Sequence, residues 1–371
     1  MNKIIFHGSP CQDFSIAGKG KGGEEGSGTR SSLLWHTVRI VKQEKPKYVI
    51  WENVKAVISK KHRETFDKYL EQMEELGYTN HYQVCNAKDY GIPQNRDRVF
   101  TISILDNKEG NCDVFNDFTF PPKQELKLRL KDMLEDEVDE KYYIKKILNT
   151  RLTKNYIQYS NSGKNQNSQA ERLYYQDSFC PTLSKCNSNG DKSQIILETK
   201  ENLKEYKSYI SWEDKKGRIN TQDHRAFKDD MYSETVPSME RGIPKVLSDF
   251  KIRKLTPLEC WRLMGFDDDD FHKAQEVNSN TQLYKQAGNS IVVNVLEAIF
   301  ENLFNQDDEI ELIELFGGIG APRKAMTRLG LNFKVLDYVE IDKYAVLSYN
   351  AIYGENYDPK DITEYGDDTN E

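Results

Sequence analysis

The sequence lacks the features that would tie it to a membrane, an export route or a bound metal. No hydrophobic run approaches the roughly 20 residues of a membrane-spanning helix. The first residues lead directly into strand-like sequence instead of a secretory leader. The six cysteines form no CxxC pair and share no zinc-type spacing with histidine. We therefore expect a soluble cytoplasmic protein with reduced thiols and no metal site.

Net positive charge and internal repeats are also missing. The 371 residues carry a formal net charge of -8, which argues weakly against a nucleic-acid partner. The charge is unevenly spread, because residues 121–250 hold 23 Lys and Arg against 21 Asp and Glu, a balance of +2. Contact with phosphates depends on local charge, so this middle region permits it. The length allows a large domain together with a second, smaller one.

Hydrophobic periodicity predicts an α/β fold on both sides of the middle region. Strands alternate with helices, which implies a mostly parallel sheet. In the first part, strands are predicted at 4–6, 48–51, 82–84 and 99–104, and helices around 33–41 and 66–76. In the last part, helices are predicted at 256–265, around 292–304 and from after Pro322 to about 329, and strands at 310–315 and 333–339. Thr256 is the expected N-cap, with Pro257 at the first helical position.

The middle region, residues 121–250, differs from the rest of the chain in amino-acid composition. Lys, Asn, Ser and Tyr dominate, and long apolar periods are absent. We interpret it as an inserted, loop-rich second domain with short strands. Disorder is the alternative, although tyrosines and isolated apolar pairs favour some packing.

Cys11 is the first candidate for chemistry. It follows a short apolar strand and precedes a Gly-rich segment, at the place where open α/β sheets hold reactive groups. A thiolate is the strongest nucleophile that a side chain offers near neutral pH. The alternative is a small buried residue, since free cysteine is often buried.

A glycine-rich turn at 316–322 is the second candidate. Glycines let the backbone turn tightly, and the following helix presents free N–H groups. Glu340, at the end of the next strand, is placed to bind ribose hydroxyls. The glycines do not form GxGxxG, which disfavours a nicotinamide cofactor. The alternative is an ordinary tight connection between a strand and a helix.

Glu52, Arg96 and Arg98 are the remaining candidates for catalytic or binding residues. Glu52 follows the predicted strand 48–51, at the same sheet edge as Cys11, and is a candidate acid or base. Arg96 and Arg98 project to one side of an extended chain and could clamp a carbonyl or a phosphate. Taken alone, Glu52 is more typical of a capping or solvated glutamate, and the two arginines are equally compatible with surface salt bridges.

Together these segments resemble the DNA (cytosine-5) methyltransferases, with bacterial and phage modification enzymes as the nearest relatives. The resemblance covers nearly the whole chain outside residues 121–245. Six segments are similar to the family's motifs, namely 10–12 (nucleophile), 52–54 (glutamate), 94–98 (two arginines), 253–260, 286–290 and 316–320 (cofactor turn).

The resemblance implies a fold and a reaction. The fold is a Rossmann-like S-adenosylmethionine-dependent methyltransferase sheet with an inserted, smaller target-recognition domain. The reaction is methyl transfer to C5 of a flipped-out cytosine in a specific duplex sequence, through a covalent bond from Cys11 to C6. Glu52 would bind N3 and the exocyclic amine, and Arg96 and Arg98 would hold O2 and the nearby sugar–phosphate.

The resemblance also implies S-adenosylmethionine as the cofactor. Phe316 would stack on the adenine, Glu340 would bind the ribose and Asp361 the adenine amine, while Leu33 and Asn289 would line the pocket. The other implied cofactor-binding residues are Gly317, Gly318, Gly320, Ile341 and Ser290. Residues 18–28 have the composition of a mobile lid, with an ordinary surface loop as the alternative.

The order of the segments departs from the family. The cofactor turn usually comes first, whereas here it lies at the C-terminal end, so the chain looks circularly permuted. We expect catalytic parts at 1–120 and 251–371 and a target-recognition domain at 121–250. That domain should read bases in the major groove. Its more basic half holds Arg151, Lys154, Lys164, Arg172, Lys185 and Lys192.

The expected partner is double-stranded DNA, bound by a monomer, and the sequence leaves open whether a cognate restriction endonuclease exists. Two alternatives remain at this point. One is an RNA methyltransferase of the same fold, but residues 9–11 and the long insertion favour DNA as the substrate. The other is a DNA-binding relative without activity, against which the intact Cys11, Glu52 and arginines speak.

Overall fold

The computed structural model describes residues 2–14, 22–106, 118–142 and 252–365. Between these last two ranges it describes the short strands 150–152, 156–159, 172–175, 180–181 and 194–196. Within the described residues, no helix is long and apolar enough to cross a membrane. The same part of the chain holds no group of three or more His, Cys, Asp or Glu residues that could bind a metal ion.

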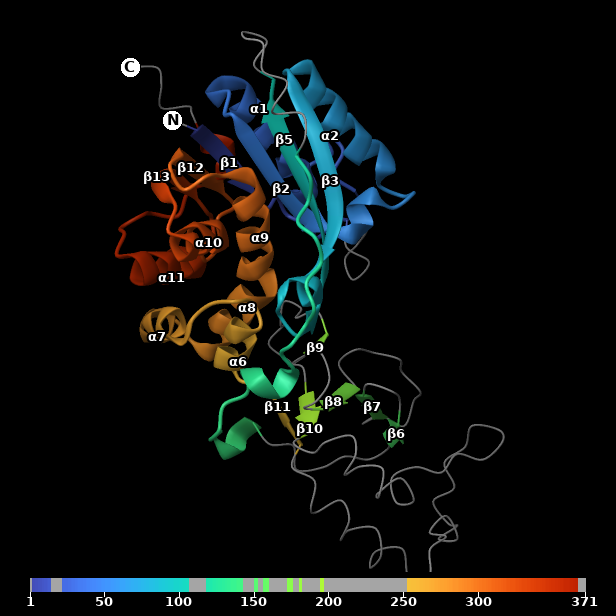
Figure 1. Cartoon of the computed structure of the whole chain (residues 1–371), viewed down its shortest axis with the longest axis vertical. Coiled ribbons are helices and arrows are strands. Elements are labelled where there is room, and N and C mark those ends of the chain that lie inside the picture. Colours follow the sequence, from blue (N-terminus) through green and yellow to red (C-terminus); the bar gives the residue numbers. More distant parts are fainter. Residues whose placement is uncertain are drawn as a thin grey trace, which may run out of the picture.

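A six-stranded sheet forms the centre of the molecule (Figure 1). Every strand is parallel to its neighbours except β5, which runs antiparallel between β2 and β3. The predicted mostly parallel α/β sheet is therefore confirmed. Its strands, in spatial order, are β13 (Asn332–Val339), β12 (Glu309–Leu315), β1 (Asn2–His7), β2 (Tyr48–Val54), β5 (Asp97–Leu105) and β3 (Tyr78–Asn86).

Helices cover both faces of this sheet (Figure 1). Successive side chains of a strand point to opposite faces, and β1 follows this rule: Ile5 packs with helices α1 (Leu34–Glu44) and α2 (Arg63–Glu75). Its neighbours Ile4 and Phe6 pack with α9 (Val293–Leu303) and α10 (Ala321–Leu329). The predicted helices in these four places are thus confirmed, with shifts of a few residues at their ends.

Helix α6 (Pro257–Arg262) begins as the sequence predicts. Thr256 is its N-cap, its hydroxyl accepts a hydrogen bond from the Glu259 backbone N–H at 3.2 Å, and Pro257 is the first helical residue. Three helices had no sequence prediction: α7 (Asp268–Val277), α8 (Asn280–Asn289) and α11 (Lys343–Tyr353). Acidic N-caps at Asp267 and Asp342 were the available signal for α7 and α11.

Short 3₁₀-helices connect the main elements. They are η1 (Arg30–Leu33), η2 (Lys55–Ile58), η3 (Ala87–Tyr90), η5 (Leu130–Met133), η6 (Glu140–Tyr142) and η9 (Ile362–Glu364). Residues 121–142 follow the expected boundary at 120, and they pack on the helical layer through the buried Leu130. The backbone N–H of Glu135 donates to the buried carboxylate of Glu259 at 2.9 Å.

The middle region contributes a second sheet with the order β11-β10-β8-β7-β6, and β4 pairs with β9. These strands are β4 (Gln94–Asn95), β6 (Thr150–Leu152), β7 (Tyr156–Tyr159), β8 (Arg172–Tyr175), β9 (Cys180–Pro181), β10 (Gln194–Ile196) and β11 (Ile252–Lys254). Arg151 and Arg172 lie in strands whose side chains are not described. Lys154, Lys164, Lys185 and Lys192 lie outside the described residues, so the DNA-reading role of this region stays a prediction.

The last strands of the chain lie beside the first. β12 pairs with β1 over its length, from Asn2 opposite Ile310 to His7 opposite Leu315. Ile362 of η9 belongs to the same buried cluster as Ile5. The glycine turn that follows β12 therefore emerges at the same sheet edge as Cys11, which follows β1, because parallel neighbours end together.

Candidate active site

The loop that carries Cys11 is held to the sheet by hydrogen bonds from β2. The indole N–H of Trp51 donates to the Ser9 hydroxyl at 3.0 Å, and the Asn53 side chain donates to the Ser9 carbonyl at 3.1 Å. Asn53 and Trp51 are buried, so both bonds are shielded from water. The start of the loop is thus fixed against the strand that holds Glu52.

A second anchor comes from η1. The Ser31 hydroxyl donates to the Pro10 carbonyl at 2.7 Å and accepts from the Asp13 backbone N–H at 3.1 Å. Cys11 lies between these two contacts, with a free, half-buried thiol. Backbone on both sides of the thiol is therefore positioned while the thiol itself stays accessible.

Glu52 lies inside a strand and not after one. The predicted strand ended at Trp51, but β2 continues to Val54 and pairs Glu52 with Phe100 of β5. The carboxylate is buried, and its Oε1 lies 2.9 Å from Nε of Arg98. Burial raises the pKa of Glu52, and the charges of Arg98 and Arg96 partly offset that rise.

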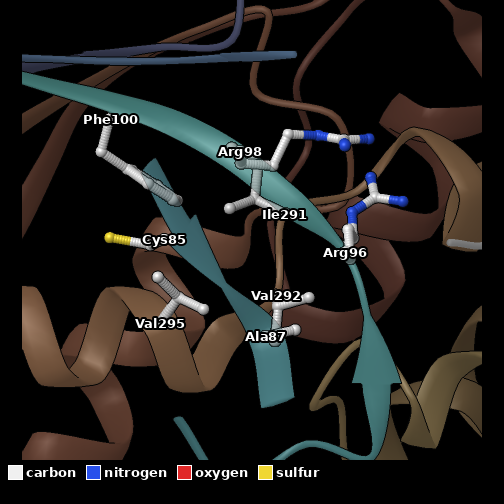
Figure 2. Close-up of a pocket in the computed structure, with 8 residues that line it drawn as sticks. All are labelled: Cys85, Ala87, Arg96, Arg98, Phe100, Ile291, Val292 and Val295. Carbon is white, nitrogen blue, oxygen red and sulfur yellow. The ribbon is translucent and has the colours of Figure 1, made fainter. Parts of the chain in front are cut away.

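The two arginines have different partners. Figure 2 shows their guanidinium groups pointing to the same side of the strand, away from Cys85, as predicted. The Arg96 side chain is only 2% exposed and donates to the carbonyls of Ser290 and Gly288 at 2.7 and 3.2 Å. Arg98 pairs with Glu52 instead. Burial, and then the charge of Arg98, lowers the pKa of Arg96 to about 9.

These charges surround the thiol of Cys11. Burial raises the pKa of Cys11, and the carboxylate of Glu52 raises it further. Arg98 and Arg96 act in the opposite direction. In the free protein the thiol therefore keeps its proton more strongly than an ordinary cysteine does, and ionisation depends on the balance between one carboxylate and two guanidinium groups.

The glycine turn after β12 is shaped by three tyrosines. A side chain at Gly320 would lie 2.6 Å from the ring of Tyr353 and 2.7 Å from that of Tyr349, and its φ is +77°. A side chain at Gly317 would lie 2.6 Å from the ring of Tyr338. The Tyr338 hydroxyl donates to the Gly318 carbonyl at 2.6 Å. Packing underneath, as well as backbone conformation, thus requires glycine here.

The opposite side of the turn is open. Gly318 has φ +57°, and nothing lies within 4 Å of the place where its Cβ would be. Phe316 also has a positive φ, of 56°, and packs at the margin of the buried cluster around Ile5, as does Leu33. Open space at Gly318 beside the partly exposed side chains of Phe316 and Leu33 suits a ligand with an apolar or aromatic part.

Glu340 and Ile341 follow β13 beside this turn. The Glu340 carboxylate accepts hydrogen bonds from the backbone N–H groups of Gly318 at 3.1 Å and Asp342 at 2.8 Å, and burial raises its pKa. Ile341 is 64% exposed, which is unusual for a large apolar residue. Asp361 caps η9 and accepts from the Thr363 backbone N–H at 2.9 Å.

Helix α8 brings Asn289 and Ser290 to the same area. Near its end, the Lys285 side chain forms an ion pair with Asp342, and the Gln286 side chain donates to the Tyr344 carbonyl at 2.8 Å. Asn289 is exposed at the last turn, and Ser290 is the C-cap. The loop that Arg96 holds is therefore also tied to the start of α11.

Sequence reasoning missed Glu314, the residue before the last of β12. It is fully buried, and its Oε2 accepts a hydrogen bond from the Tyr349 hydroxyl at 2.7 Å. Burial raises the pKa of Glu314 to about 7. A carboxylate in an otherwise apolar strand directly before a glycine turn was the signal that could have found it.

Residues 22–28 belong to the expected lid, of which residues 18–21 lie outside the described part. Gly22 and Gly23 are tied down in this structure. The Thr29 hydroxyl donates to the Gly22 carbonyl at 2.9 Å, and the Trp35 indole donates to the Gly23 carbonyl at 2.8 Å. The lid role stays a prediction.

Comparison with known proteins shows the family of this chain. The family model described as C-5 cytosine-specific DNA methylase matches residues 2–305. The chain is 39% identical over 295 residues to the type II methyltransferase M2.ScrFI of Lactococcus lactis subsp. cremoris, covering 80% of this chain and 64% of that protein. It is 33% identical over 365 residues to the orphan methyltransferase M.SPRI of Bacillus phage SPR, covering 81% and 82%.

Solved structures share the fold. A methyltransferase from Entamoeba histolytica, EhMeth, has a TM-score of 0.50 at 18% identity and covers 82% of this chain and 78% of its own. A DNMT2 structure from Spodoptera frugiperda has a TM-score of 0.51 at 17% identity, with 82% and 80% covered. The family match ends before β12, so the glycine turn is recognised only by its own residues and its place in the sheet.

Proposed function

The chain belongs to the C-5 cytosine-specific DNA methylase family, and we propose that the site described above methylates C5 of a cytosine flipped out of duplex DNA. The observation that carries the proposal is the convergence of three groups at one sheet edge. Cys11 follows β1, Glu52 lies near the end of β2, and Arg98 of β5 is paired with Glu52 at 2.9 Å. A nucleophile, an acid and a cation thus face one small volume.

The residues beside the glycine turn fit S-adenosylmethionine, the cofactor that this family implies. Ile341 and Phe316 offer apolar surfaces for the adenine, and Glu340 keeps acceptor capacity for ribose hydroxyls while two backbone N–H groups hold it. Gly318 leaves open space above the turn. Asp361, Leu33, Asn289 and Ser290 complete the proposed pocket, with Gly317 and Gly320 shaping its floor.

In the proposed mechanism, Cys11 begins the reaction. Its thiolate adds to C6, and the electrons of the C5–C6 double bond move toward C5. The guanidinium groups of Arg98 and Arg96 favour the thiolate, while Glu52 opposes it until that carboxyl is protonated or bound to the base. When bound, S-adenosylmethionine supplies an electrophilic methyl group for the activated C5.

Glu52 stabilises the charge that Cys11 creates. Because burial raises its pKa, the carboxyl can hold a proton and donate it as a hydrogen bond to N3 of the base. Arg98 orients that carboxyl and is placed to reach O2. After a base removes the C5 proton, the bond between Sγ and C6 breaks and restores the free cysteine.

Arg96 has a different role in this proposal. Its guanidinium is buried and bonded to two carbonyls of the 288–290 loop, so it positions that loop instead of contacting the base. It still lowers the pKa of Cys11 through its charge. In this proposal Arg96 positions the loop 288–290 beside the cofactor, and Arg98 contacts the base.

Methyl transfer to DNA tests the proposal directly. Purified protein is incubated with labelled S-adenosylmethionine and unmethylated duplex DNA, and the product is sequenced after bisulfite treatment. We expect protected cytosines in one sequence context, and no incorporation by Cys11→Ser, whose cofactor affinity should stay within a few fold. Incorporation into tRNA but not DNA, or full activity of Cys11→Ser, would contradict the proposal.

We also propose that the chain acts as a monomer on double-stranded DNA. One chain supplies the nucleophile loop, Glu52, the arginines and the cofactor turn, so no second copy is needed to complete the site. Sedimentation of the active protein with and without duplex DNA tests this. The relatives include proteins named as type II and as orphan methyltransferases, and cleavage of unmethylated DNA by the source cell's extract would reveal a restriction partner.

A further inference from the structure

The turn that follows the catalytic strand β2 has an unusual charge. Residues 55–63 contain four cations, Lys55, Lys60, Lys61 and Arg63, and no acidic residue, in a chain whose net charge is -8. All four side chains are exposed. Mutual repulsion among like charges in one turn is unfavourable unless an anionic partner offsets it.

This turn lies against the nucleophile loop. The ring of His62 packs edge-on against Phe14 with centroids 5.3 Å apart, and the Phe14 backbone N–H donates to the Cys11 carbonyl at 3.1 Å. A side chain at Gly22 would lie 3.7 Å from Nδ1 of His62. The buried side chain of His62 anchors the turn beside the loop that carries Cys11. The neighbouring Lys60 and Lys61 are exposed to solvent.

Two of the four cations already have protein partners. Lys55 pairs with Asp97 at 3.2 Å, and Arg63 pairs with Asp67 at 2.7 Å and covers the ring of Phe66. Within the part of the chain that the structure describes, neither Lys60 nor Lys61 takes part in an ion pair or side-chain hydrogen bond. These two lysines are therefore available to an external anion.

We infer that Lys60 and Lys61 bind phosphates of the DNA backbone beside the flipped cytosine. The inference rests on the proposed function and adds a docking surface to it. A base that enters the site beside Cys11 brings its own sugar–phosphate chain to the same sheet edge. Duplex DNA carries one negative charge per roughly 1.7 Å of its axis, so two adjacent exposed lysines there meet phosphates without base specificity.

The salt dependence of DNA binding tests this inference. Binding of a fluorescein-labelled, mixed-sequence duplex of about 30 base pairs is followed by anisotropy while salt is raised from about 50 to 200 mM. Each phosphate contact contributes about 0.9 to the slope of log K against log salt. The double variant Lys60→Gln/Lys61→Gln should therefore show a slope smaller in magnitude by about 1 to 2.

The matched control is Lys42→Gln/Lys45→Gln, which removes the same charge from the end of α1. Both lysines are exposed, and they precede β2 whereas Lys60 and Lys61 follow it, so they lie at the opposite end of that strand. We expect the control to keep the wild-type slope. Thermal unfolding and calorimetric cofactor binding verify that both double variants are folded.

The outcomes separate this inference from the proposed function. A smaller slope for the 60/61 variant alone supports phosphate contact by these lysines. An unchanged slope, or equal reductions in both double variants, overturns it even if the wild-type protein methylates DNA. The separate methyl-transfer assay tests the proposed function, which is contradicted if the wild-type protein does not methylate DNA.

Discussion

At the scale of single residues, the site is a balance of charges around one thiol. Glu52 raises the pKa of Cys11, and Arg98 and Arg96 lower it, so each of these side chains affects the thiol through its charge. Burial amplifies all three effects, because a low local dielectric weakens screening. The ionisation of Cys11 should therefore respond to changes in its neighbours that leave the fold intact.

Replacing Glu52 tests this balance. Glu52→Gln keeps the size of the side chain and removes its negative charge, so the pKa of Cys11 should fall. The rate of alkylation by iodoacetamide, followed by mass spectrometry of the peptide that contains Cys11, should rise at lower pH than in the wild type. Glu75→Gln, an exposed change at the end of α2, serves as the control. An unchanged alkylation profile in Glu52→Gln would contradict the electrostatic role of Glu52.

The two arginines should differ when each is replaced by lysine. Lysine lacks the planar fork, so Arg96→Lys loses its bonds to the carbonyls of Ser290 and Gly288 and loosens the cofactor loop. We expect the dissociation constant for S-adenosylmethionine to rise about tenfold, the equivalent of one charge-assisted hydrogen bond. Arg98→Lys should keep that constant and lower the rate of methyl transfer. Calorimetry and single-turnover kinetics measure both, and identical effects of the two variants would refute the division.

At the scale of elements, the glycine turn is defined by what packs beneath it. β12 supplies the buried Glu314, and β13 and α11 supply the tyrosines that touch Gly317 and Gly320. The turn is thus fixed from below while its upper side stays open at Gly318. Two glycines in one turn therefore carry different constraints.

Alanine at each of these positions separates the constraints. Gly320→Ala meets the rings of Tyr349 and Tyr353 as well as a positive φ, and should lower the unfolding free energy by about 2–4 kcal/mol. Gly318→Ala meets only the positive φ and should cost about 1–2 kcal/mol. Urea unfolding measures both changes. Equal losses would show that packing against the tyrosines does not restrict the turn.

Glu314 should make stability depend on pH. Its pKa is about 7 in the folded protein against 4.5 for an ordinary glutamate, so the folded state binds this proton more tightly. The resulting stabilisation is full below pH 4.5 and is lost as the pH rises through about 7. When the pH is raised from 5 to 8, the free energy of unfolding of the wild type should fall by about 2–3 kcal/mol relative to that of Glu314→Gln, which cannot ionise. Urea melts at both pH values test this, and parallel pH profiles would exclude it.

At the scale of the whole molecule, the sheet brings together parts that the chain separates. The glycine turn lies some 300 residues after Cys11 in sequence, yet β12 and β1 are hydrogen-bonded neighbours. A permuted order of the family's segments, which the sequence predicts, does not require a different spatial order of strands. Function should follow the sheet and not the connectivity.

A rearranged chain tests this statement. Joining residue 371 to residue 1 and opening the polar link between Asn305 and Asp308 would place the glycine turn first. We expect the rate of methyl transfer to stay within about tenfold of the wild type, because domains tolerate new ends in exposed links. Opening the chain inside β12, after Leu312, is the control and should abolish activity. Loss of activity in both variants would show that connectivity matters.

The sequence by itself determined the local features of this protein. Apolar periodicity located β1, β2, β12 and β13, and the cap at Thr256 marked the start of α6, because these signals involve residues within a few positions of each other. The motif residues were identified in the same way, by type and spacing along the chain.

Only the tertiary structure decided how those residues are used. Arg96 bonds to Ser290, 194 positions away, and Glu314 meets Tyr349 across 35 positions, contacts that no local pattern encodes. The extension of β2 through Glu52 depends on pairing with β5, a neighbour supplied by the sheet. The different partners of Arg96 and Arg98, the elevated pKa of Glu314 and the position of the glycine turn at the sheet edge of Cys11 all arise from burial and pairing between distant segments. These effects exist only once the sheet has formed.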